Sequence, residues 1–319
     1  YKNKRTMLRT IDLFAGIGGI RLGFESAGFE SVFSNDFEPA CKVTYDLNFE
    51  TSKLHIEDIR NIDSTSLPDF DFLLGGFPCQ AFSIAGHRQG FDDEKDRGNL
   101  FFHIAKILKQ KQPSGFLLEN VKNLVSHDSC KTFQTIQSIL SELDYHVKFQ
   151  VMNTMNYGNV PQNRERIYIV GFKSFQHCMQ FSFPNQIPLT KTIEDLLESA
   201  PVNQKYYYNG KTLYDRIKDD VIDSSKIYQW RRQYVRENKK NVCPTLTANM
   251  GTGGHNVPIV KDSVGIRKLT PRECLRFQGF PDSYILPSIS DGALYKQVGN
   301  SVSVPVIERI AQQIRVTLD

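Results

Sequence analysis

The 319-residue sequence lacks any long apolar run. A membrane-spanning helix needs about 18 or more consecutive apolar residues, so we expect no membrane span. Residues 1–10 are polar and basic and lack the apolar core of a signal peptide. We therefore expect a protein of the cytoplasm.

The cysteines are few and far apart. Six are present, at positions 41, 79, 130, 178, 243 and 274, and no two form a C-x-x-C pair. This spacing indicates neither a zinc site nor a disulfide framework, so we expect no metal and mostly buried, inert thiols. The net charge of +4 is too mild to indicate nucleic acid by itself.

The first half of the chain alternates short apolar runs with amphipathic stretches. We expect helices at 17–27, 101–109 and 132–143, and strands at 8–14, 31–35, 70–75, 115–119, 146–152 and 166–172. Such alternation is typical of βαβ units, in which helices cover both faces of a mostly parallel sheet. The predicted fold class is therefore α/β with a doubly wound sheet.

The pattern changes after about residue 184. Prolines 184, 188 and 201 interrupt the chain, and a polar, tyrosine-rich region follows. Regular patterning returns near Arg267 and ends in an expected helix at 305–317. We predict a larger domain from residues 1–184 and 266–319, with residues 185–265 inserted as a smaller one.

A glycine-rich turn follows the first expected strand. The stretch Asp12–Gly19 reads DLFAGIGG, and its glycines allow a tight turn and close approach of a ligand to the backbone. The dinucleotide-binding fingerprint G-x-G-x-x-G is not matched, because Arg21 occupies the position of its last glycine. This disfavours a nicotinamide cofactor but not a nucleoside-type cofactor. The Asp36 carboxylate is a candidate to accept hydrogen bonds from ribose hydroxyls, and the Asp58 carboxylate is a candidate to accept one from an adenine amino group. The alternative is a turn with structural acids.

A second motif, Gly75–Ser83 (GGFPCQAFS), also follows a strand. Ligands bind at the carboxyl ends of parallel strands, so Cys79 is expected to face the same cleft. Pro78 stiffens the turn that presents the thiol. The polar segment 85–99 is typical of a lid loop. The alternative is a buried, unreactive cysteine.

Two charged motifs follow later strands. Glu119 comes directly after a strand, which places its carboxylate at the same sheet edge as Cys79. The stretch 162–168 (QNRERIY) leads into another strand, and we expect one of Arg164 and Arg166 to face the cleft and the other to pair with an acid. The alternatives are a helix-capping or solvent-facing Glu119 and surface salt bridges, above all for Arg164.

Taken together, five motifs in this order resemble the cytosine-5 DNA methyltransferases of bacterial restriction-modification systems. They are Phe-Ala-Gly-x-Gly-Gly (14–19), Pro-Cys-Gln (78–80), Glu-Asn-Val (119–121), Gln-x-Arg-x-Arg (162–166) and Gly-Asn-Ser-Val (299–302). The resemblance covers residues 8–172 and 266–318. It implies a Rossmann-like domain that uses S-adenosylmethionine, with residues 185–265 as a target-recognition domain that binds DNA.

The resemblance also implies a mechanism for methylating a cytosine that is flipped out of double-stranded DNA. Cys79 adds to C6 of the cytosine. Glu119, protonated and with a raised pKa, hydrogen-bonds N3. Arg166 holds the O2 side of the ring, and Arg164 belongs to the same catalytic motif. A base must finally remove the proton from C5. Both a water chain and a side chain are compatible with the sequence as this base.

Binding residues follow from the same resemblance. For S-adenosylmethionine they are Phe14, Ala15, Gly16, Gly18, Gly19, Asp36, Asp58, Ile59, Phe77, Leu100, Asn300 and Val302. For DNA they are Ser83, Ala85, His87, Arg88, Arg231, Arg232, Thr245, Asn249, His255 and Asn256. Ala85 lacks the hydroxyl of the Ser-Ile-Ser-Gly found in many relatives, so a polar plug must come from elsewhere, His87 and Arg88 being candidates.

The DNA prediction for the insert depends partly on composition. Residues 226–240 carry six basic residues and interleaved aromatics against one acid, Glu237. Such a mixture suits phosphate and base contacts. The alternative is an amphipathic helix with a solvated charged face. The resemblance of 244–249 to the family's Thr-Leu recognition element favours DNA.

Three other functions compete with this interpretation. The RNA-acting branch of the family characteristically carries the tripeptide Cys-Phe-Thr. This tripeptide is absent here, which disfavours an RNA cytosine methyltransferase. An inactive DNA-binding relative is disfavoured by the intact Cys79, Glu119 and Arg166, and a nicotinamide dehydrogenase by Arg21. We expect a monomer in a prokaryotic cytoplasm, on the nucleoid, whose cognate restriction endonuclease acts on the same site.

Overall fold

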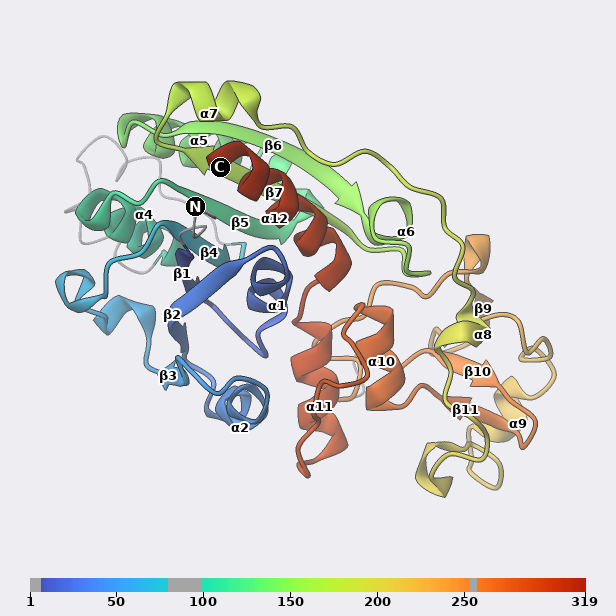
Figure 1. Ribbon diagram of the computed structural model, residues 1–319. Helices are drawn as coiled ribbons and strands as arrows, with labels where there is room; N and C mark the ends of the chain where they lie inside the picture. The colour runs from blue at the N-terminus through green and yellow to red at the C-terminus, as the bar shows by residue number, and fades with distance from the viewer. Residues whose placement is uncertain (1–6, 80–98, 253–256) are drawn as a thin grey trace, which may run out of the picture. The chain divides into compact units, whose positions relative to one another are not determined.

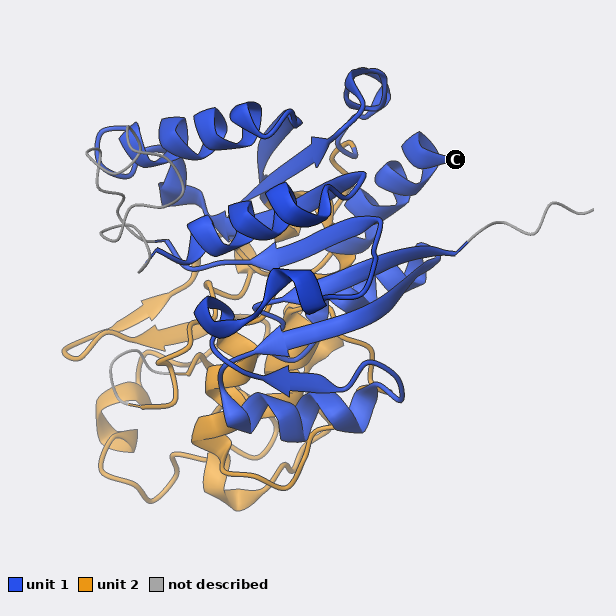
Figure 2. Ribbon diagram, turned by 90° about the vertical axis from the view of Figure 1, so that its left-hand side faces the viewer, with its two compact units in different colours: residues 1–152, 165–184, 307–319 blue, residues 153–164, 185–306 orange. Residues whose placement is uncertain are grey.

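The computed structural model describes residues 7–79, 99–252 and 257–319 (Figure 1). The chain forms two compact units, which Figure 2 distinguishes by colour. Unit 1 contains residues 1–152, 165–184 and 307–319, and unit 2 contains residues 153–164 and 185–306. In the described part of the chain, every helix is too short or too polar to cross a membrane.

Unit 1 is built on a seven-stranded sheet with the order β3-β2-β1-β4-β5-β7-β6. Its strands are β1 (Leu8–Leu13), β2 (Phe29–Asp36), β3 (Leu54–Ile56), β4 (Phe72–Gly76), β5 (Gly115–Val121), β6 (His146–Asn153) and β7 (Glu165–Phe172). The pairings among β1 to β5 are parallel, whereas β7 runs antiparallel to β5. The predicted α/β class with a mostly parallel sheet is therefore confirmed.

Helices cover both faces of this sheet (Figure 1). They are α1 (Gly19–Ser26), α2 (Pro39–Asn48), α4 (Leu100–Lys111), α5 (Lys131–Glu142), α7 (Phe175–Gln180) and α12 (Val304–Leu318), with 3₁₀ turns η1 (Ile59–Asn61), η2 (Ser64–Ser66) and η3 (Lys122–Val125). The predicted strands and helices of this unit occur within a few residues of their expected ends. The short β3 and the helices α2 and α7 were not predicted, because none of the three has a clear apolar periodicity.

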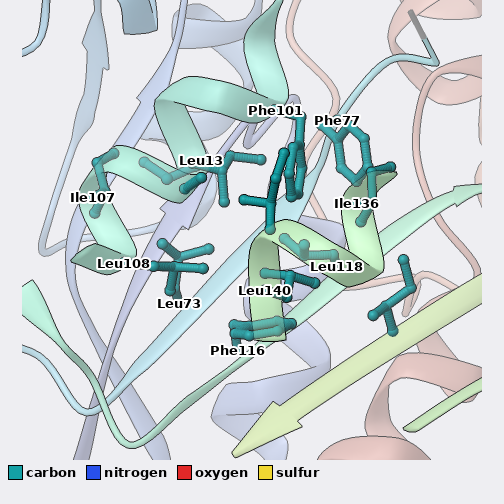
Figure 3. Close-up of a cluster of buried hydrophobic side chains, with 14 of the residues drawn as sticks. Leu13, Leu73, Phe77, Phe101, Ile107, Leu108, Phe116, Leu118, Ile136 and Leu140 are labelled. Carbon is teal, nitrogen blue, oxygen red and sulfur yellow. The ribbon is translucent and has the colours of Figure 1, made fainter. Parts of the chain in front are cut away.

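Alternation along the strands explains the two buried layers. Figure 3 shows the larger layer, in which Leu73 of β4 and Leu118 of β5 pack with α4 and α5 side chains such as Leu108 and Leu140. Phe72 points to the other face and packs on Phe24 of α1, with ring centroids 6.0 Å apart. Successive residues of one strand thus serve opposite layers.

Unit 2 contains a four-stranded antiparallel sheet with the order β11-β10-β8-β9. Its strands are β8 (Tyr228–Trp230), β9 (Val235–Glu237), β10 (Ile259–Lys261) and β11 (Ile266–Lys268); its helices and 3₁₀ turns are α6 (Thr154–Tyr157), α8 (Ile193–Leu196), η4 (Gln204–Tyr206), α9 (Tyr214–Ile217), η5 (Lys239–Asn241), α10 (Pro271–Phe277) and α11 (Asp291–Gly299).

The basic and aromatic stretch 226–240 is a hairpin of β8 and β9. The alternative of an amphipathic helix is therefore wrong. A tight turn joins the strands, with Arg232 at φ 68° and the Arg231 amide donating to the Tyr234 carbonyl at 2.9 Å. Tyr228 is buried on one side, while Arg231 and Arg232 are exposed at the tip.

The structural division differs from the predicted domain boundary at 265/266. Residues 266–306 group with 185–265 in unit 2, because β11 pairs with β10 and because Arg267 is fully buried between two acids. The Arg267 guanidinium contacts Asp262 at 2.7 Å and Glu273 at 2.6 Å. The role of 185–265 in target recognition stays a prediction.

Gly171 of β7 tests the packing of the sheet. A Cβ at this position would lie 2.2 Å from the Phe116 ring, so we expect Gly171→Ala to destabilise the protein by about 1–3 kcal/mol through overpacking. Gly292→Ala in α11 is the control, since no atom lies within 4 Å of its added Cβ, and it should stay within about 1 kcal/mol of the parent. Thermal unfolding measures both, and equal melting temperatures for Gly171→Ala and the parent would contradict the packing argument.

Candidate active site

The predicted glycine-rich turn lies between β1 and α1. Phe14, Gly16 and Gly18 all have positive φ, of 51°, 53° and 85°. A Cβ on Gly18 would lie 2.3 Å from the Phe49 ring, so that position requires glycine. A Cβ on Gly16 would meet no atom within 4 Å, so one side of the turn is open to a ligand.

The end of β2 holds this turn in place. The Ala15 amide donates to the Asn35 carbonyl at 3.0 Å, and the Gly16 amide donates to Asp36 Oδ2 at 2.8 Å. Asp36 Oδ1 accepts from the Glu38 amide at 3.0 Å. The structure therefore brings the predicted ribose carboxylate and the predicted turn into direct contact.

Asp58 and Ile59 follow β3 at the start of η1. Both Asp58 oxygens bond Arg60, with Oδ1 3.0 Å from Nε, and these bonds lower the pKa of Asp58 to about 2. Ile59 is buried. An adenine amino group at Asp58 would have to share an oxygen with Arg60.

Sequence analysis missed Phe37, which directly follows Asp36. Its side chain is 69% exposed, although it is a large aromatic. An exposed ring beside the predicted ribose carboxylate suits stacking on a purine base. Its place next to Asp36 was the signal that could have found it. The open turn, Asp36 and Phe37 together fit a nucleoside-type cofactor.

The remaining predicted cofactor residues differ in their surroundings. Phe77 is buried against Phe101, with ring centroids 5.6 Å apart, and Leu100 is half-buried at the start of α4. Asn300 and Val302 belong to unit 2, where Asn300 is exposed and Val302 buried.

Cys79 follows the end of β4 and packs partly against the large core layer. Burial raises the pKa of its thiol above the ordinary value. The preceding turn is anchored by Asn120, whose side-chain amide donates to the Phe77 carbonyl at 2.8 Å. Sequence analysis named Asn120 only as part of a motif and missed this positioning role, because the two residues are 43 positions apart.

Glu119 and Arg166 form an ion pair on neighbouring strands. Arg166 Nε lies 3.2 Å from Glu119 Oε1, and the two side chains are only 16% and 11% exposed. In the β5–β7 register Glu119 faces Tyr168 and Val121 faces Arg166, so the pair is diagonal. The alternative of a solvent-facing Glu119 is therefore wrong, and the arginine that pairs with an acid is Arg166.

Arg164 lies in unit 2 and is buried, so a surface salt bridge is wrong for this residue. Its guanidinium donates to three backbone carbonyls: to Leu246 at 2.9 Å, to Gly299 at 3.2 Å and to Ser301 at 2.7 Å. Arg164 thereby joins the Gln-x-Arg segment to the Thr-Leu and Gly-Asn-Ser-Val motifs.

The predicted DNA contacts are only partly described. Thr245 is half-buried, and its hydroxyl donates to the Asn163 carbonyl at 2.6 Å. Asn249 is exposed. Ser83, Ala85, His87, Arg88, His255 and Asn256 lie outside the described residues.

Known proteins match the chain along almost its whole length. The family model for C-5 cytosine-specific DNA methylases matches residues 8–316. The Type II methyltransferase M.Bsp6I of Bacillus sp. (strain RFL6) is 54% identical over 312 residues, covering 97% of this chain and 98% of that protein. The Type II methyltransferase M.HhaI of Haemophilus parahaemolyticus is 39% identical over 333 residues, covering 98% and 96%.

Solved structures agree in fold. The Dnmt2 methyltransferase of S. pombe superposes with a TM-score of 0.74 at 21% identity, covering 98% of this chain and 99% of that one. The methyltransferase EhMeth of Entamoeba histolytica superposes with a TM-score of 0.74 at 17% identity, covering 99% and 100%. The matches in sequence lead to one conclusion: the chain belongs to the C-5 cytosine-specific DNA methylase family.

Proposed function

We propose that this member of the family methylates C5 of a flipped-out cytosine in double-stranded DNA through a covalent bond between Cys79 and C6. The observation that carries the proposal is the placement of three groups at one end of the sheet of unit 1. Cys79 follows β4, and the neighbouring strand β5 carries both Glu119 and Asn120, the latter bonded to the turn that leads to Cys79. Methyl transfer to cytosine C5 is the function of the family.

The proposed nucleophile must lose its proton before it attacks. Because burial raises the pKa of Cys79, its thiol is protonated in the free protein near neutral pH. When the substrate is bound, the thiol gives up its proton to solvent water and the sulfur adds to C6, while Glu119 shares its proton with N3, which makes C5 electron-rich. S-adenosylmethionine, when bound, supplies the methyl group that C5 accepts. A base, either water or a side chain, then takes the C5 proton, the C6–S bond breaks to release Cys79, and N3 returns its proton to Glu119.

Glu119 and Arg166 act on the opposite side of the ring in this proposal. A protonated Glu119 donates to N3 as negative charge develops in the ring. The carboxylate left behind would be costly to bury alone, and Arg166 at 3.2 Å compensates its charge. Arg166 also has donors for the O2 side of the ring.

The cofactor site proposed for S-adenosylmethionine lies at the β1–α1 turn. The open side of the turn from Phe14 and Ala15 to Gly19 receives the methionine end, and Asp36 accepts from the ribose hydroxyls. Phe37 stacks on the adenine, with Asp58 and Ile59 at its edge. Phe77 and Leu100 border the pocket from the side of β4 and α4. Asn300 and Val302 of unit 2 stay predicted cofactor residues on the resemblance alone.

Unit 2 reads the DNA in this proposal. The exposed tip of the β8–β9 hairpin presents Arg231 and Arg232 to the backbone or bases, while Thr245 binds a phosphate and Asn249 a base edge. Arg164 is a positioning residue, because its guanidinium is engaged with three carbonyls. The type II relatives support a role in restriction-modification, with an endonuclease specific for the same site.

Replacement of the nucleophile tests the covalent step. We expect Cys79→Ser to lower methyl transfer at least about 10³-fold, because a hydroxyl is a far weaker nucleophile than a thiolate. Binding of DNA and cofactor should persist. The assay measures transfer of a labelled methyl group to plasmid DNA, with gel shifts and calorimetry for binding. Cys130→Ser, at an exposed thiol, is the matched control and should keep full activity; robust turnover by Cys79→Ser would rule out the mechanism.

A double-mutant cycle tests the Glu119–Arg166 pair. We expect Glu119→Gln to lower single-turnover methylation by about 10²–10⁴-fold, because the amide has no acidic proton for N3. Adding Arg166→Ala should cost much less than it does in the parent, since the pair acts as a unit. Asp69→Asn breaks the exposed pair with Lys111 and should leave the rate unchanged. Fully additive losses would argue against a coupled pair.

Exchange of the insert tests the recognition domain. We expect a chimera that carries residues 185–265 of a relative with another target site to methylate that relative's site, because the exchanged segment holds the base contacts. Bisulfite sequencing of plasmid DNA from an expressing strain reports both the base and its sequence context. An active chimera that retained the parent's target site would contradict the assignment of 185–265.

A further inference from the structure

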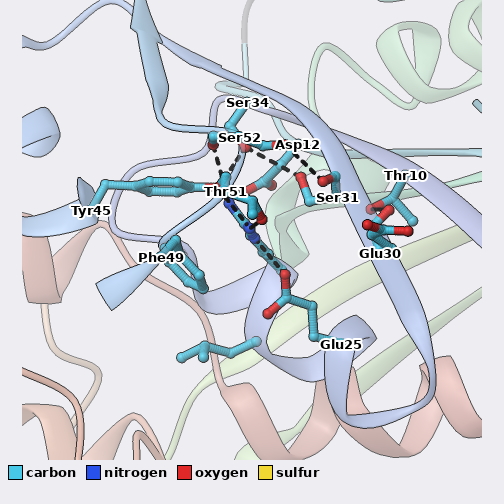
Figure 4. Close-up of polar contacts among 12 residues, drawn as sticks. Thr10, Asp12, Glu25, Glu30, Ser31, Ser34, Tyr45, Phe49, Thr51 and Ser52 are labelled. Carbon is cyan, nitrogen blue, oxygen red and sulfur yellow. Dashed lines mark hydrogen bonds and ion pairs between the residues drawn. The ribbon is translucent and has the colours of Figure 1, made fainter. Parts of the chain in front are cut away.

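Arg21 of α1 is a buried charge that the proposed mechanism does not use. Its side chain is only 2% exposed, so its guanidinium depends on partners within the protein. This is the residue that occupies the last glycine position of the dinucleotide-binding fingerprint. Its partners come from α1, from α2 and from the loop that follows α2. They are labelled in Figure 4: Glu25, Tyr45, Phe49, Thr51 and Ser52.

Hydrogen bonds join the guanidinium to all three segments. Its Nε lies 2.6 Å from Glu25 Oε1, one turn further along α1, and its Nη1 reaches the Tyr45 hydroxyl at 3.4 Å. Nη1 also donates to the Ser52 carbonyl at 3.2 Å, and Nη2 donates to the Thr51 carbonyl at 3.0 Å. The Tyr45 hydroxyl in turn donates to Asp12 Oδ2 at 2.9 Å, which extends the network to β1.

The guanidinium also lies over the Phe49 ring, with its Cζ 4.2 Å from the ring centroid. A planar cation stacks favourably on an aromatic face, and more so when both are withdrawn from water, as here. The same ring packs against the proposed cofactor turn, because a Cβ on Gly18 would clash with it. Arg21 and the turn therefore contact the same aromatic side chain.

The loop that Arg21 holds leads directly into β3. This strand begins two residues after Ser52 and pairs with the end of β2, where Asp36 lies opposite Ile56. Asp58 follows β3. The position of the loop therefore affects the strand between the two carboxylates of the proposed cofactor site.

Burial makes this set of contacts mutually dependent. A guanidinium withdrawn from water is costly when it loses a partner, so movement of the loop or of Phe49 would leave the charge of Arg21 under-compensated. The network thus opposes displacement of the ring at Gly18 and of the loop before β3. A turn that is already held in its binding conformation costs less to order when a ligand binds.

We propose that Arg21 is a positioning residue of the cofactor site: it holds Phe49 against the β1–α1 turn and fixes the loop before β3, so its loss weakens cofactor binding. The inference rests on the proposed function, because it takes this turn as the site of S-adenosylmethionine. The chemical step should not depend on Arg21, since Cys79, Glu119 and Arg166 are held by β4, β5 and β7.

Replacement of Arg21 by methionine tests the inference in the full chain. Arg21→Met keeps an unbranched apolar stem but removes the charge and the donors, and we expect Kd for S-adenosylmethionine to rise about tenfold or more. The KM for the cofactor should rise in parallel, whereas kcat at saturating cofactor keeps the parent's value. Calorimetric titration measures Kd, and methyl transfer to plasmid DNA at varied cofactor concentration measures KM and kcat.

Arg315→Met is the matched control. Arg315 of α12 has the same kinds of contact: an acid four residues on, Asp319 at 3.0 Å, the Gly28 carbonyl at 3.2 Å and the Phe29 ring with its centroid at 5.9 Å. We expect Arg315→Met to lower the melting temperature but to keep the parent's Kd and KM for the cofactor. Equal Kd values for folded Arg21→Met and Arg315→Met would overturn the role of Arg21.

A double-mutant cycle tests the route through Phe49 with milder changes, which also serve if Arg21→Met does not fold. Arg21→Lys keeps the charge but loses the planar fork, and Phe49→Leu keeps apolar bulk but loses the aromatic face. Each should weaken cofactor binding, and the double variant should weaken it by clearly less than the product of the two fold-changes. A double variant that shows the full product would overturn the route through Phe49.

Asp36→Ala separates these failures from failure of the cofactor site. If Asp36→Ala binds S-adenosylmethionine as tightly as the parent, the site itself is misplaced and the inference falls with it. If Asp36→Ala weakens binding while Arg21→Met keeps the parent's Kd, the site holds and only the role of Arg21 is refuted.

Discussion

The antiparallel pairing of β7 with β5 is the constraint on which the geometry of the proposed active site depends. The pairings among β1 to β5 are parallel, so they bring the carboxyl ends of these strands to one edge of the sheet. The residues that follow these ends belong to loops. Because β7 runs the other way, its first residues lie opposite the last residues of β5. Arg166 therefore reaches Glu119 from within a strand, where backbone hydrogen bonds fix its position.

Burial is the physical property that the site residues share. The Cys79 thiol is partly desolvated, the Glu119–Arg166 pair is largely withdrawn from water, and Asp12 has no exposure at all. Each of these groups has a costly charged form unless a partner compensates it. A negative charge that develops at the site is therefore stabilised only where a hydrogen-bond donor or a cation is already in place. Such preorganised donors are the condition for electrostatic stabilisation of a transition state.

The Gln-x-Arg-x-Arg motif serves both units, because the chain leaves unit 2 between Arg164 and Glu165. Gln162 donates to the Phe277 carbonyl at 2.5 Å, and Arg164 holds three carbonyls, so both organise unit 2. Arg166 lies two residues later, in the sheet of unit 1. One short motif thus combines residues that organise unit 2 with Arg166, the proposed catalytic arginine of unit 1.

The sequence by itself determined the α/β class and the turn after β1 and named Cys79 as the candidate nucleophile, because apolar periodicity and the glycine and proline pattern of a turn are local properties. Tertiary structure alone decided which arginine meets Glu119, that 226–240 is a hairpin, that Asn120 anchors the turn before Cys79, and that Asp12 bonds Tyr45. The Asn120–Phe77 contact spans 43 residues and the Tyr45–Asp12 contact spans 33, and no local pattern encodes such pairs. Desolvation likewise depends on everything that packs around a group, so the raised pKa of the Cys79 thiol follows only from the folded chain.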